Sequence, residues 1–199
     1  MASVLLVCLA SYLLGSIPNG LVFGKLIWHV DLREYGSHNI GATNAWRTLG
    51  KGPGFLIFLL DFLKGALSVG LAEVFAPLPL VMVIAGILAI VGHSCSLFLH
   101  FKGGKGVATG LGVIAMLMPL PSFIVFLVWL AIVMVTKYVS LGSCIAAALV
   151  PILSYAWGYP GAYTAFGVLA AAFIIIRHKA NIVRLMNGTE NKIHAGHRD

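Results

Sequence analysis

Four clusters of polar and basic residues interrupt an otherwise apolar sequence, and each contains groups that can bind an anion. The first runs from Ser37 to Arg47 and reads SHNIGATNAWR. Its Ser, Thr and Asn side chains supply neutral hydrogen-bonding groups and Arg47 adds a charged planar fork, a combination that suits phosphate oxygens. The ordinary alternative for such a segment is a solvated connecting loop.

The second cluster is the sequence KGGKG at residues 102–106, which directly precedes an apolar run. Glycines allow backbone N–H groups to point at one ligand, a helix N-terminus adds a positive dipole end, and Lys105 adds a full charge. The pattern lacks the spacing of a Walker A loop, so it does not predict nucleotide hydrolysis. A flexible basic loop that contacts acidic lipid head groups is the alternative.

The third and fourth clusters lie at the boundaries of two later apolar runs. In the third, at residues 137–143, Ser140 or Ser143 could bind a ligand, although capping the following helix is their default role. In the fourth, at residues 177–181, His178 and Asn181 are three positions apart and share one helix face. An interfacial anchor is the more common role of such a pair.

Two further polar sites fall inside apolar runs. Asp61 and Lys64 are three residues apart, so we expect them to form an ion pair that lowers the cost of burying either charge. The histidines show neither the HExxH nor the Cys/His spacing of zinc sites. We therefore predict no metal held by the protein.

The apolar runs that must position these clusters dominate the composition. Of 199 residues, 60% are hydrophobic and 10% are charged, and the mean hydropathy is +0.99. A soluble domain has about 45–50% apolar and about 25% charged residues, so this chain belongs in a bilayer. Because the apolar runs are continuous rather than alternating, they favour helices over a β-barrel. The predicted fold class is an all-α integral membrane protein.

We expect a single transmembrane domain over residues 1–199, with seven helices near 2–24, 53–74, 79–100, 107–118, 122–136, 140–157 and 161–178. Pro119 and Pro121 divide 107–136 into two segments rather than one long helix. The first segment lacks a basic start, so we predict that it is retained rather than cleaved as a signal peptide. Without CxxC spacing, the three cysteines are expected to be free.

The distribution of basic residues sets the predicted orientation. With seven spans, the N-terminus outside and the C-terminus in the cytoplasm, the loops on the inside hold nearly all basic residues and the outside turns hold none. The inside set comprises Lys25, Arg33, Arg47, Lys51, Lys102, Lys105, Lys137, Arg177, Lys179, Arg184, Lys192 and Arg198. A re-entrant hairpin over 107–136 would give the same result. This asymmetry explains the net charge of +7 without nucleic acid as a partner.

These motifs, taken in order, closely resemble the bacterial acyl-phosphate:glycerol-3-phosphate acyltransferases, the PlsY family. The matching segments cover nearly the whole chain and read GSIP at 15–18, SxNIGATNxxR at 37–47, DFxKG at 61–65, GH at 92–93, FKGGKGVAT at 101–109, YVSL at 138–141 and RHxxN at 177–181. The sequence departs from the family pattern at His38, Ser96 and Ala180, and the first of these changes bears on the geometry of the loop.

The resemblance implies an enzyme of phospholipid biosynthesis in the bacterial inner membrane, with its active site facing the cytoplasm. It implies acyl phosphate and glycerol 3-phosphate as substrates, lysophosphatidic acid and inorganic phosphate as products, and contact with membrane lipids. No cofactor and no obligate protein partner are expected. We predict Ser37, Arg47, Lys105 and His178 as catalytic residues, and substrate binding by Asn39, Thr43, Asn44, Gly103, Gly104, Ser143 and Asn181.

An acyl phosphate already carries a good leaving group, so direct attack by the glycerol hydroxyl requires no acyl-enzyme. The enzyme must hold two anions together and stabilise the oxyanion. The proton can pass to His178 or to a substrate phosphate, and we favour the phosphate. Acyltransferases that use coenzyme A often carry an HxxxxD pattern, and neither His93 nor His178 is followed in that way. A transporter or a structural subunit is disfavoured because the polar clusters gather at one face.

Overall fold

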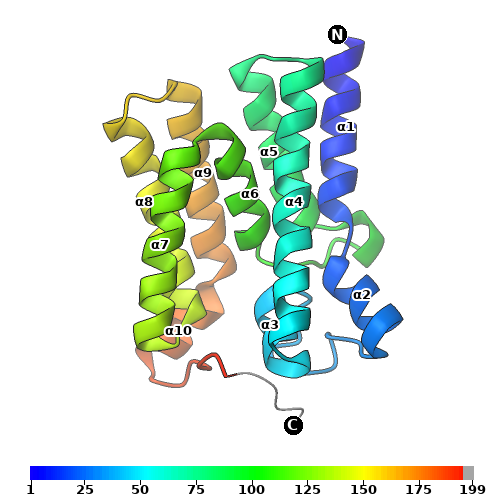
Figure 1. The fold of residues 1–199 in the computed structure, drawn as a ribbon, viewed down its shortest axis with the longest axis vertical. Coiled ribbons are helices and arrows are strands. Elements are labelled where there is room, and N and C mark those ends of the chain that lie inside the picture. Colours follow the sequence, from blue (N-terminus) through cyan, green and yellow to red (C-terminus); the bar gives the residue numbers. More distant parts are fainter. Residues whose placement is uncertain (195–199) are drawn as a thin grey trace.

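The computed structural model describes residues 1–194, and every regular element in this range is a helix (Figure 1). Arg198, which belongs to the predicted inside set, lies outside the described residues. The helices are α1 (Ala2–Ser16), α2 (Asn19–Trp28), α3 (Ala42–Leu49), α4 (Lys51–Phe75), α5 (Pro79–Ser94), the 3-10 turn η1 (Leu97–Leu99), α6 (Val107–Leu117), α7 (Pro119–Thr136), α8 (Val139–Ala156), α9 (Gly161–Arg177) and α10 (Lys179–Met186).

Four helices in the described range are long and apolar enough to cross a bilayer, and the count rises to six if each of two bent pairs forms one span. The bent pairs are α1 with α2 and α9 with α10. Because α6 has only 11 residues, it falls short of the ~20 residues that cross a hydrocarbon core. The prediction of an all-α membrane protein is confirmed, whereas a total of seven spans remains a prediction.

The first predicted helix, 2–24, is wrong as a single helix. The chain bends by 44° between α1 and α2, and Pro18 lies at the break because it has no N–H for the helical ladder. The carbonyl of Ile17 accepts a hydrogen bond of 2.9 Å from the Lys64 ammonium group on α4. That ammonium also pairs with Asp61 at 3.0 Å, which confirms the predicted ion pair and joins it to the bend.

Two short helices, α3 and α10, were not predicted. Each helix has only eight residues, and polar residues alternate with apolar ones along its sequence. Neither helix therefore gives a long apolar run. The break between the predicted segments 107–118 and 122–136 is confirmed at Met118, and Pro119 begins α7, where a missing N–H costs nothing. The three cysteines are free, as predicted.

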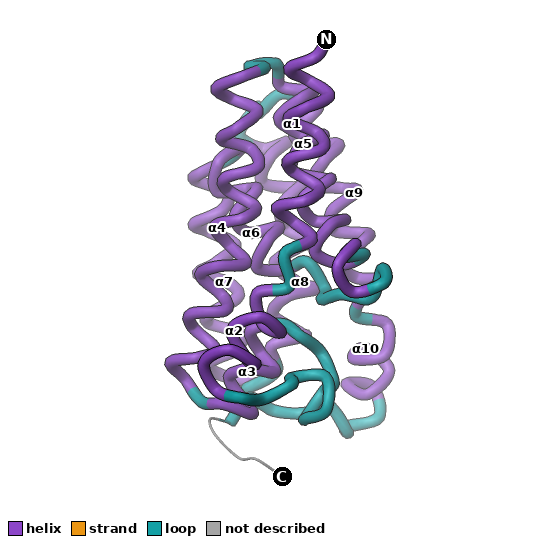
Figure 2. The backbone as a smooth tube through the Cα atoms, turned by 90° about the vertical axis from the view of Figure 1, so that its right-hand side faces the viewer, coloured by secondary structure: helices purple, strands orange, loops and turns teal. Residues whose placement is uncertain are grey.

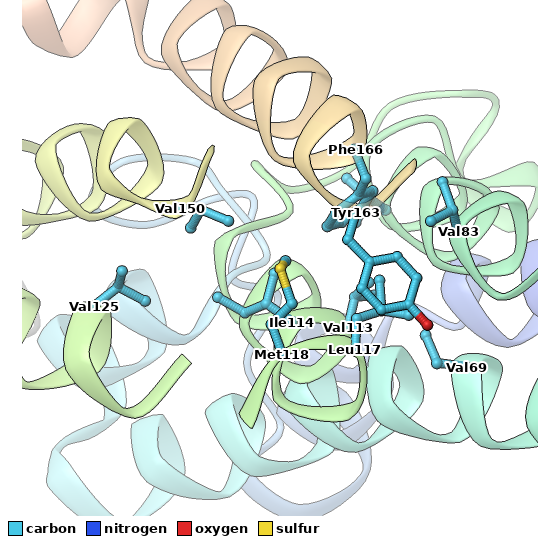
Figure 3. Close-up of a cluster of buried hydrophobic side chains, with 11 residues drawn as sticks. Val69, Val83, Val113, Ile114, Leu117, Met118, Val125, Val150, Tyr163 and Phe166 are labelled. Carbon is cyan, nitrogen blue, oxygen red and sulfur yellow. The ribbon is translucent and has the colours of Figure 1, made fainter. Parts of the chain in front are cut away.

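The short helix α6 lies at the centre of the bundle. On one side it packs against α4 and α5, and on the other against α7 and α9. Gly65 of α4 and Gly112 of α6 lie where these two helices approach each other closely. A Cβ at either position would clash with a backbone carbonyl of the other helix. Residues of α6 form the middle of the largest buried apolar cluster, together with Val69, Val83, Tyr163 and Phe166 (Figure 3).

The N-terminus and the short helices lie at opposite ends of the bundle (Figure 1). Figure 2 shows that α2, α3, α10 and the loops between them gather at one end, close to the end of the described chain. We call this region the loop end. It brings together segments that are far apart in the sequence, and all four polar clusters approach it.

Candidate active site

An elongated cavity begins at the loop end and continues between helices α6, α7, α8 and α9. The wall near the loop end is polar, and the wall further along is apolar. The polar part includes Ser37, Asn39, Thr43, Asn44, Arg47, Lys105, Ser140, Ser143, His178, Asn181, Arg184 and Glu190. Nine of the eleven predicted site residues therefore line one cavity, and the exceptions are Gly103 and Gly104.

The first cluster is a loop held in shape from within. The Asn44 amide oxygen accepts the Ser37 N–H at 2.9 Å, and its nitrogen donates to carbonyls of the same loop, including that of Leu32 at 2.9 Å. Similarly, the side-chain oxygen of Asn39 accepts the Gly41 N–H at 2.9 Å. Asn44 and Oδ1 of Asn39 thus fix the backbone of the loop, and Ser37 and Thr43 of the same segment line the cavity.

Arg47 projects from α3 and retains a free donor. One terminal nitrogen donates to the carbonyl of Asn191 at 2.8 Å, whereas Nε is buried and has no hydrogen-bond partner. Burial lowers the pKa of the guanidinium, although the nearby Glu190 carboxylate opposes this. The group remains protonated at any physiological pH. A buried N–H without a partner is uncommon and is suited to an incoming anion.

Lys105 lies beside this guanidinium. Its ammonium donates to the Asn181 amide oxygen at 2.6 Å, so the second and fourth sequence clusters meet here. The pKa of Lys105 is lowered to about 8, chiefly by burial; the Glu190 carboxylate opposes this shift, and the charges of Arg184 and Arg47 add to it. Three cations thus converge on one carboxylate, and an anionic ligand would add the negative charge that this region lacks.

The predicted amide cradle at Gly103 and Gly104 remains a prediction, and in this conformation one of its two amides is already occupied. The Gly104 N–H donates to the His93 carbonyl at 3.1 Å, so it is not free for a ligand. Arg177 donates to the carbonyls of both glycines, at 3.2 and 3.0 Å. A Cβ at Gly104 would overlap the imidazole of His93, so the glycines allow close packing. Their role here is to place Lys105.

Glu190, which sequence analysis missed, organises the opposite wall. Its carboxylate accepts hydrogen bonds from Ser140 at 2.8 Å, from the Asn181 amide at 2.7 Å and from Arg184 at 2.8 Å. Burial raises its pKa, but these three hydrogen bonds outweigh burial and the net pKa is lowered. Lying alone in the polar C-terminal segment, Glu190 gave no sequence signal apart from its charge.

Ser143 on α8 and His178, between α9 and α10, each make one side-chain hydrogen bond. Nδ1 of His178 lies 2.8 Å from the Ile174 carbonyl, and since a carbonyl can only accept, Nδ1 carries the proton. A neutral His178 therefore has its lone pair on Nε2. Ser143 donates to the Val139 carbonyl at 2.8 Å, so the default capping role is wrong for Ser143 and for Ser140, which bonds Glu190.

The ion pair of Asp61 and Lys64 belongs to a further polar cluster, of which Asp61 and His93 line the cavity. Asp61 accepts hydrogen bonds from Asn19 and Lys64, both at 3.0 Å. Nδ1 of His93 is 3.7 Å from the same carboxylate oxygen and has no hydrogen-bond partner. Within residues 1–194, no group of three or more His, Cys, Asp or Glu side chains could hold a metal ion.

Comparisons with known proteins identify the family that carries this site. A sequence model of the family described as glycerol-3-phosphate acyltransferase matches residues 5–188. The glycerol-3-phosphate acyltransferase of Syntrophomonas wolfei is 47% identical over 192 residues, which cover 96% of each chain. Glycerol-3-phosphate acyltransferase 2 of Moorella thermoacetica is 45% identical, over 95% of this chain and 97% of its own. This chain belongs to the glycerol-3-phosphate acyltransferase family.

Solved structures agree with the sequence comparisons. A crystal structure of PlsY (YgiH), an integral membrane glycerol 3-phosphate acyltransferase, in its glycerol 3-phosphate form, superposes with a TM-score of 0.92. The two chains are 42% identical, and the match covers 96% of each. The lysophosphatidic acid form gives a TM-score of 0.89 at 40% identity, over 96% of this chain and 95% of that one. The family predicted from the sequence motifs is confirmed.

Each of the three departures from the family pattern has a visible place in the fold. His38 has a φ of 55°, a left-handed conformation that glycine adopts at lower cost than histidine. The Ser96 hydroxyl donates to the carbonyl of Ser16, at the end of α1, at 2.5 Å. Ala180 is exposed on α10. None of the three removes a polar group from the cavity.

Proposed function

We propose that this acyltransferase moves a long-chain acyl group from acyl phosphate to glycerol 3-phosphate, giving lysophosphatidic acid and inorganic phosphate. One observation carries the proposal. Arg47, Lys105 and Arg184 converge at the polar mouth of a cavity whose remaining wall is apolar. Such a site suits two phosphate groups at the water boundary and an acyl chain between the helices.

The proposed work of the polar wall is to bring two anions together and to stabilise the charge of the transition state. Arg47 has a free Nε and Lys105 is held by a single hydrogen bond, so both can turn to phosphate oxygens. The hydroxyls of Ser37 and Thr43 supply neutral donors. We assign Asn44, Gly103 and Gly104 to the scaffold rather than to substrate contact.

In the reaction that we propose, the glycerol hydroxyl attacks the acyl carbon, a C–O bond forms, and the bond from that carbon to the phosphate oxygen breaks. Inorganic phosphate leaves with the bonding electron pair, and the hydroxyl proton passes to a phosphate oxygen. His178 binds the acceptor through Nε2, because Nδ1 is committed to the Ile174 carbonyl. Neither a metal nor a covalent intermediate takes part.

We further propose seven spans in a bacterial inner membrane, with the N-terminus outside and the loop end in the cytoplasm. The segments are α1 with α2, then α4, α5, α6, α7, α8 and α9. Clustering of basic residues at the loop end supports this orientation. Cysteines introduced singly at Lys51, Lys102 or Lys137 should react with an impermeant reagent only after the membrane is opened, and reaction in sealed cells would overturn the orientation.

The donor is tested with purified protein in detergent. Palmitoyl phosphate, palmitoyl-coenzyme A and palmitoyl-acyl carrier protein are supplied in parallel with glycerol 3-phosphate, and lysophosphatidic acid is measured. Of the three donors, we expect only palmitoyl phosphate to give lysophosphatidic acid. Equal or faster turnover with either thioester would contradict an acyl phosphate as the donor.

A further inference from the structure

The apolar part of the cavity has an end. Helices α6 and α8 run away from the loop end, whereas α7 and α9 run toward it (Figure 1). The lining residues furthest from the loop end are therefore Ile114 on α6, Val125 on α7, Val150 on α8 and Phe166 on α9. All four are buried, and Phe166 has no exposed surface.

These four side chains belong to the main hydrophobic core. They form one cluster with Leu117, and Figure 3 shows Ile114 and Leu117 of α6 close to Phe166 of α9. The cavity therefore ends against packed core residues. Protein interiors are close-packed, so an end of this kind resists a chain that is longer than the space in front of it.

Small residues of α6, α8 and α9 form part of the wall between the mouth and this end, while Phe126 and Trp129 of α7 also line the passage. Gly110, Ala146, Ala147, Gly167 and Ala170 all line it. The small side chains on α6, α8 and α9 leave room along the path, and on these helices the larger Ile114, Val150 and Phe166 close it. A passage that narrows at its end suits an unbranched acyl chain.

The length of the passage follows from helix geometry. Phe166 at the end lies on α9, and His178 at the mouth caps the C-terminus of the same helix, twelve residues further on. At about 1.5 Å per residue they are separated by roughly 18 Å. Half of a bilayer core of about 30 Å is roughly 15 Å, which is the depth that one lipid acyl chain fills. The passage therefore has the length of a single ordinary acyl chain.

We propose that Phe166, with Ile114, Val125 and Val150 around it, limits the length of the acyl group that the enzyme accepts. Phe166 is thereby a specificity-determining residue of the proposed reaction, and this inference rests on the proposed function. Shorter chains fit but bury fewer methylene groups, whereas longer chains must displace core side chains. The enzyme should prefer donors whose terminal methyl group just reaches Phe166.

The test uses two substitutions with opposite effects. Phe166→Ala opens space at the end, and Ala170→Phe blocks the passage nearer the mouth. Dodecanoyl, myristoyl, palmitoyl and stearoyl phosphate are compared by kcat/KM within each variant. Because these are ratios, they do not depend on the fraction of protein that is folded.

Each methylene group that gains a buried place should contribute about fourfold to kcat/KM. Phe166→Ala should therefore raise the stearoyl-to-palmitoyl ratio on the order of tenfold, since two methylenes are added. Ala170→Phe should lower the palmitoyl-to-dodecanoyl ratio by at least a similar factor. Matched controls that face away from the cavity are Phe123→Ala, on a side chain 60% exposed, and Ala172→Phe, at an exposed position. Both should keep the wild-type profile.

If Phe166→Ala fails to fold, Phe166→Leu and Ala170→Phe decide the matter. Coincident length profiles for the wild type and these variants would overturn the proposal. That failure is distinct from failure of the proposed function, in which the wild type would turn over no acyl phosphate of any length. A profile that shifts in the control variants as well would also overturn the assignment to Phe166.

Discussion

Glu190→Gln removes one negative charge from the site while keeping the size of the side chain. The carboxylate accepts three hydrogen bonds of 2.7–2.8 Å from Ser140, Asn181 and Arg184. A glutamine has one oxygen, and its NH₂ group must face at least one of these donors. Ser140 and Asn181 both donate to Oε1, which the glutamine oxygen can replace, so the NH₂ group takes the position of Oε2 and faces Nε of Arg184. The substitution therefore releases Arg184, one of the cations at the mouth of the cavity.

The magnitude follows from the number of bonds. A released Arg184 is no longer held in place for the substrate phosphate, and losing one charge-assisted hydrogen bond of about 1.5–3 kcal/mol to that anion should raise KM for glycerol 3-phosphate by roughly 10- to 150-fold. A second effect concerns Lys105, because the Glu190 carboxylate raises its pKa. In the variant, the pKa of Lys105 should fall further below its wild-type value of about 8.

The sign of the pH effect is fixed by the charge that is needed. Anion binding requires the Lys105 ammonium, so activity is present below the pKa of Lys105 and is lost as the pH rises through it. The alkaline limb of kcat/KM should therefore move to lower pH in Glu190→Gln. Steady-state kinetics between pH 6 and pH 9.5 measure both effects, with the exposed Glu73→Gln as control. A KM within threefold of wild type together with an unmoved alkaline limb would refute the reasoning.

Four further substitutions test individual groups. Arg47→Ala and Lys105→Ala should each nearly abolish turnover in folded protein, since each removes a cation from the mouth of the cavity. His178→Asn should chiefly raise KM for glycerol 3-phosphate, whereas a general base would lose about 10²- to 10⁴-fold in kcat with KM unchanged. Gly104→Ala places a Cβ against the imidazole of His93 and should lower kcat/KM by displacing Lys105.

Each of these outcomes has a clear opposite. Either cation variant with activity within a few-fold of wild type would show that the guanidinium or ammonium does not clamp phosphate. The control for Gly104→Ala is Gly52→Ala, because a Cβ at Gly52 meets nothing within 4 Å. Equal loss in both glycine variants would remove the argument from close packing. Elution from a sizing column in detergent reports folding for every variant.

Long apolar runs and breakers predicted the major helices well. The start of α6 at Val107 and the break at Met118 came from glycines and prolines that act locally. The bend at Pro18 was missed because an apolar run continues across it, and the Lys64 ammonium satisfies the Ile17 carbonyl from another helix. Such tertiary compensation leaves no trace in a local pattern.

The candidate site was predictable as a set of groups but not as a network. Ser37, Arg47, Lys105 and His178 come from separate clusters, and residue chemistry alone placed them at one membrane face. Which polar atoms are already occupied depends on partners distant in sequence, as for Arg47 and Asn191, 144 residues apart. For the same reason, the loss of Gly104 as an anion donor and the place of Glu190 required the structure.

The central claim is direct transfer between two anions that occupy the cavity together, and a rapid-mixing measurement of phosphate release tests it. Purified protein is mixed with palmitoyl phosphate alone, and then with palmitoyl phosphate and glycerol 3-phosphate. We predict no stoichiometric burst of inorganic phosphate without the acceptor, and equal amounts of phosphate and lysophosphatidic acid with it. A burst of one phosphate per enzyme from the donor alone, with palmitate trapped on Ser37 or another side chain, would contradict direct transfer.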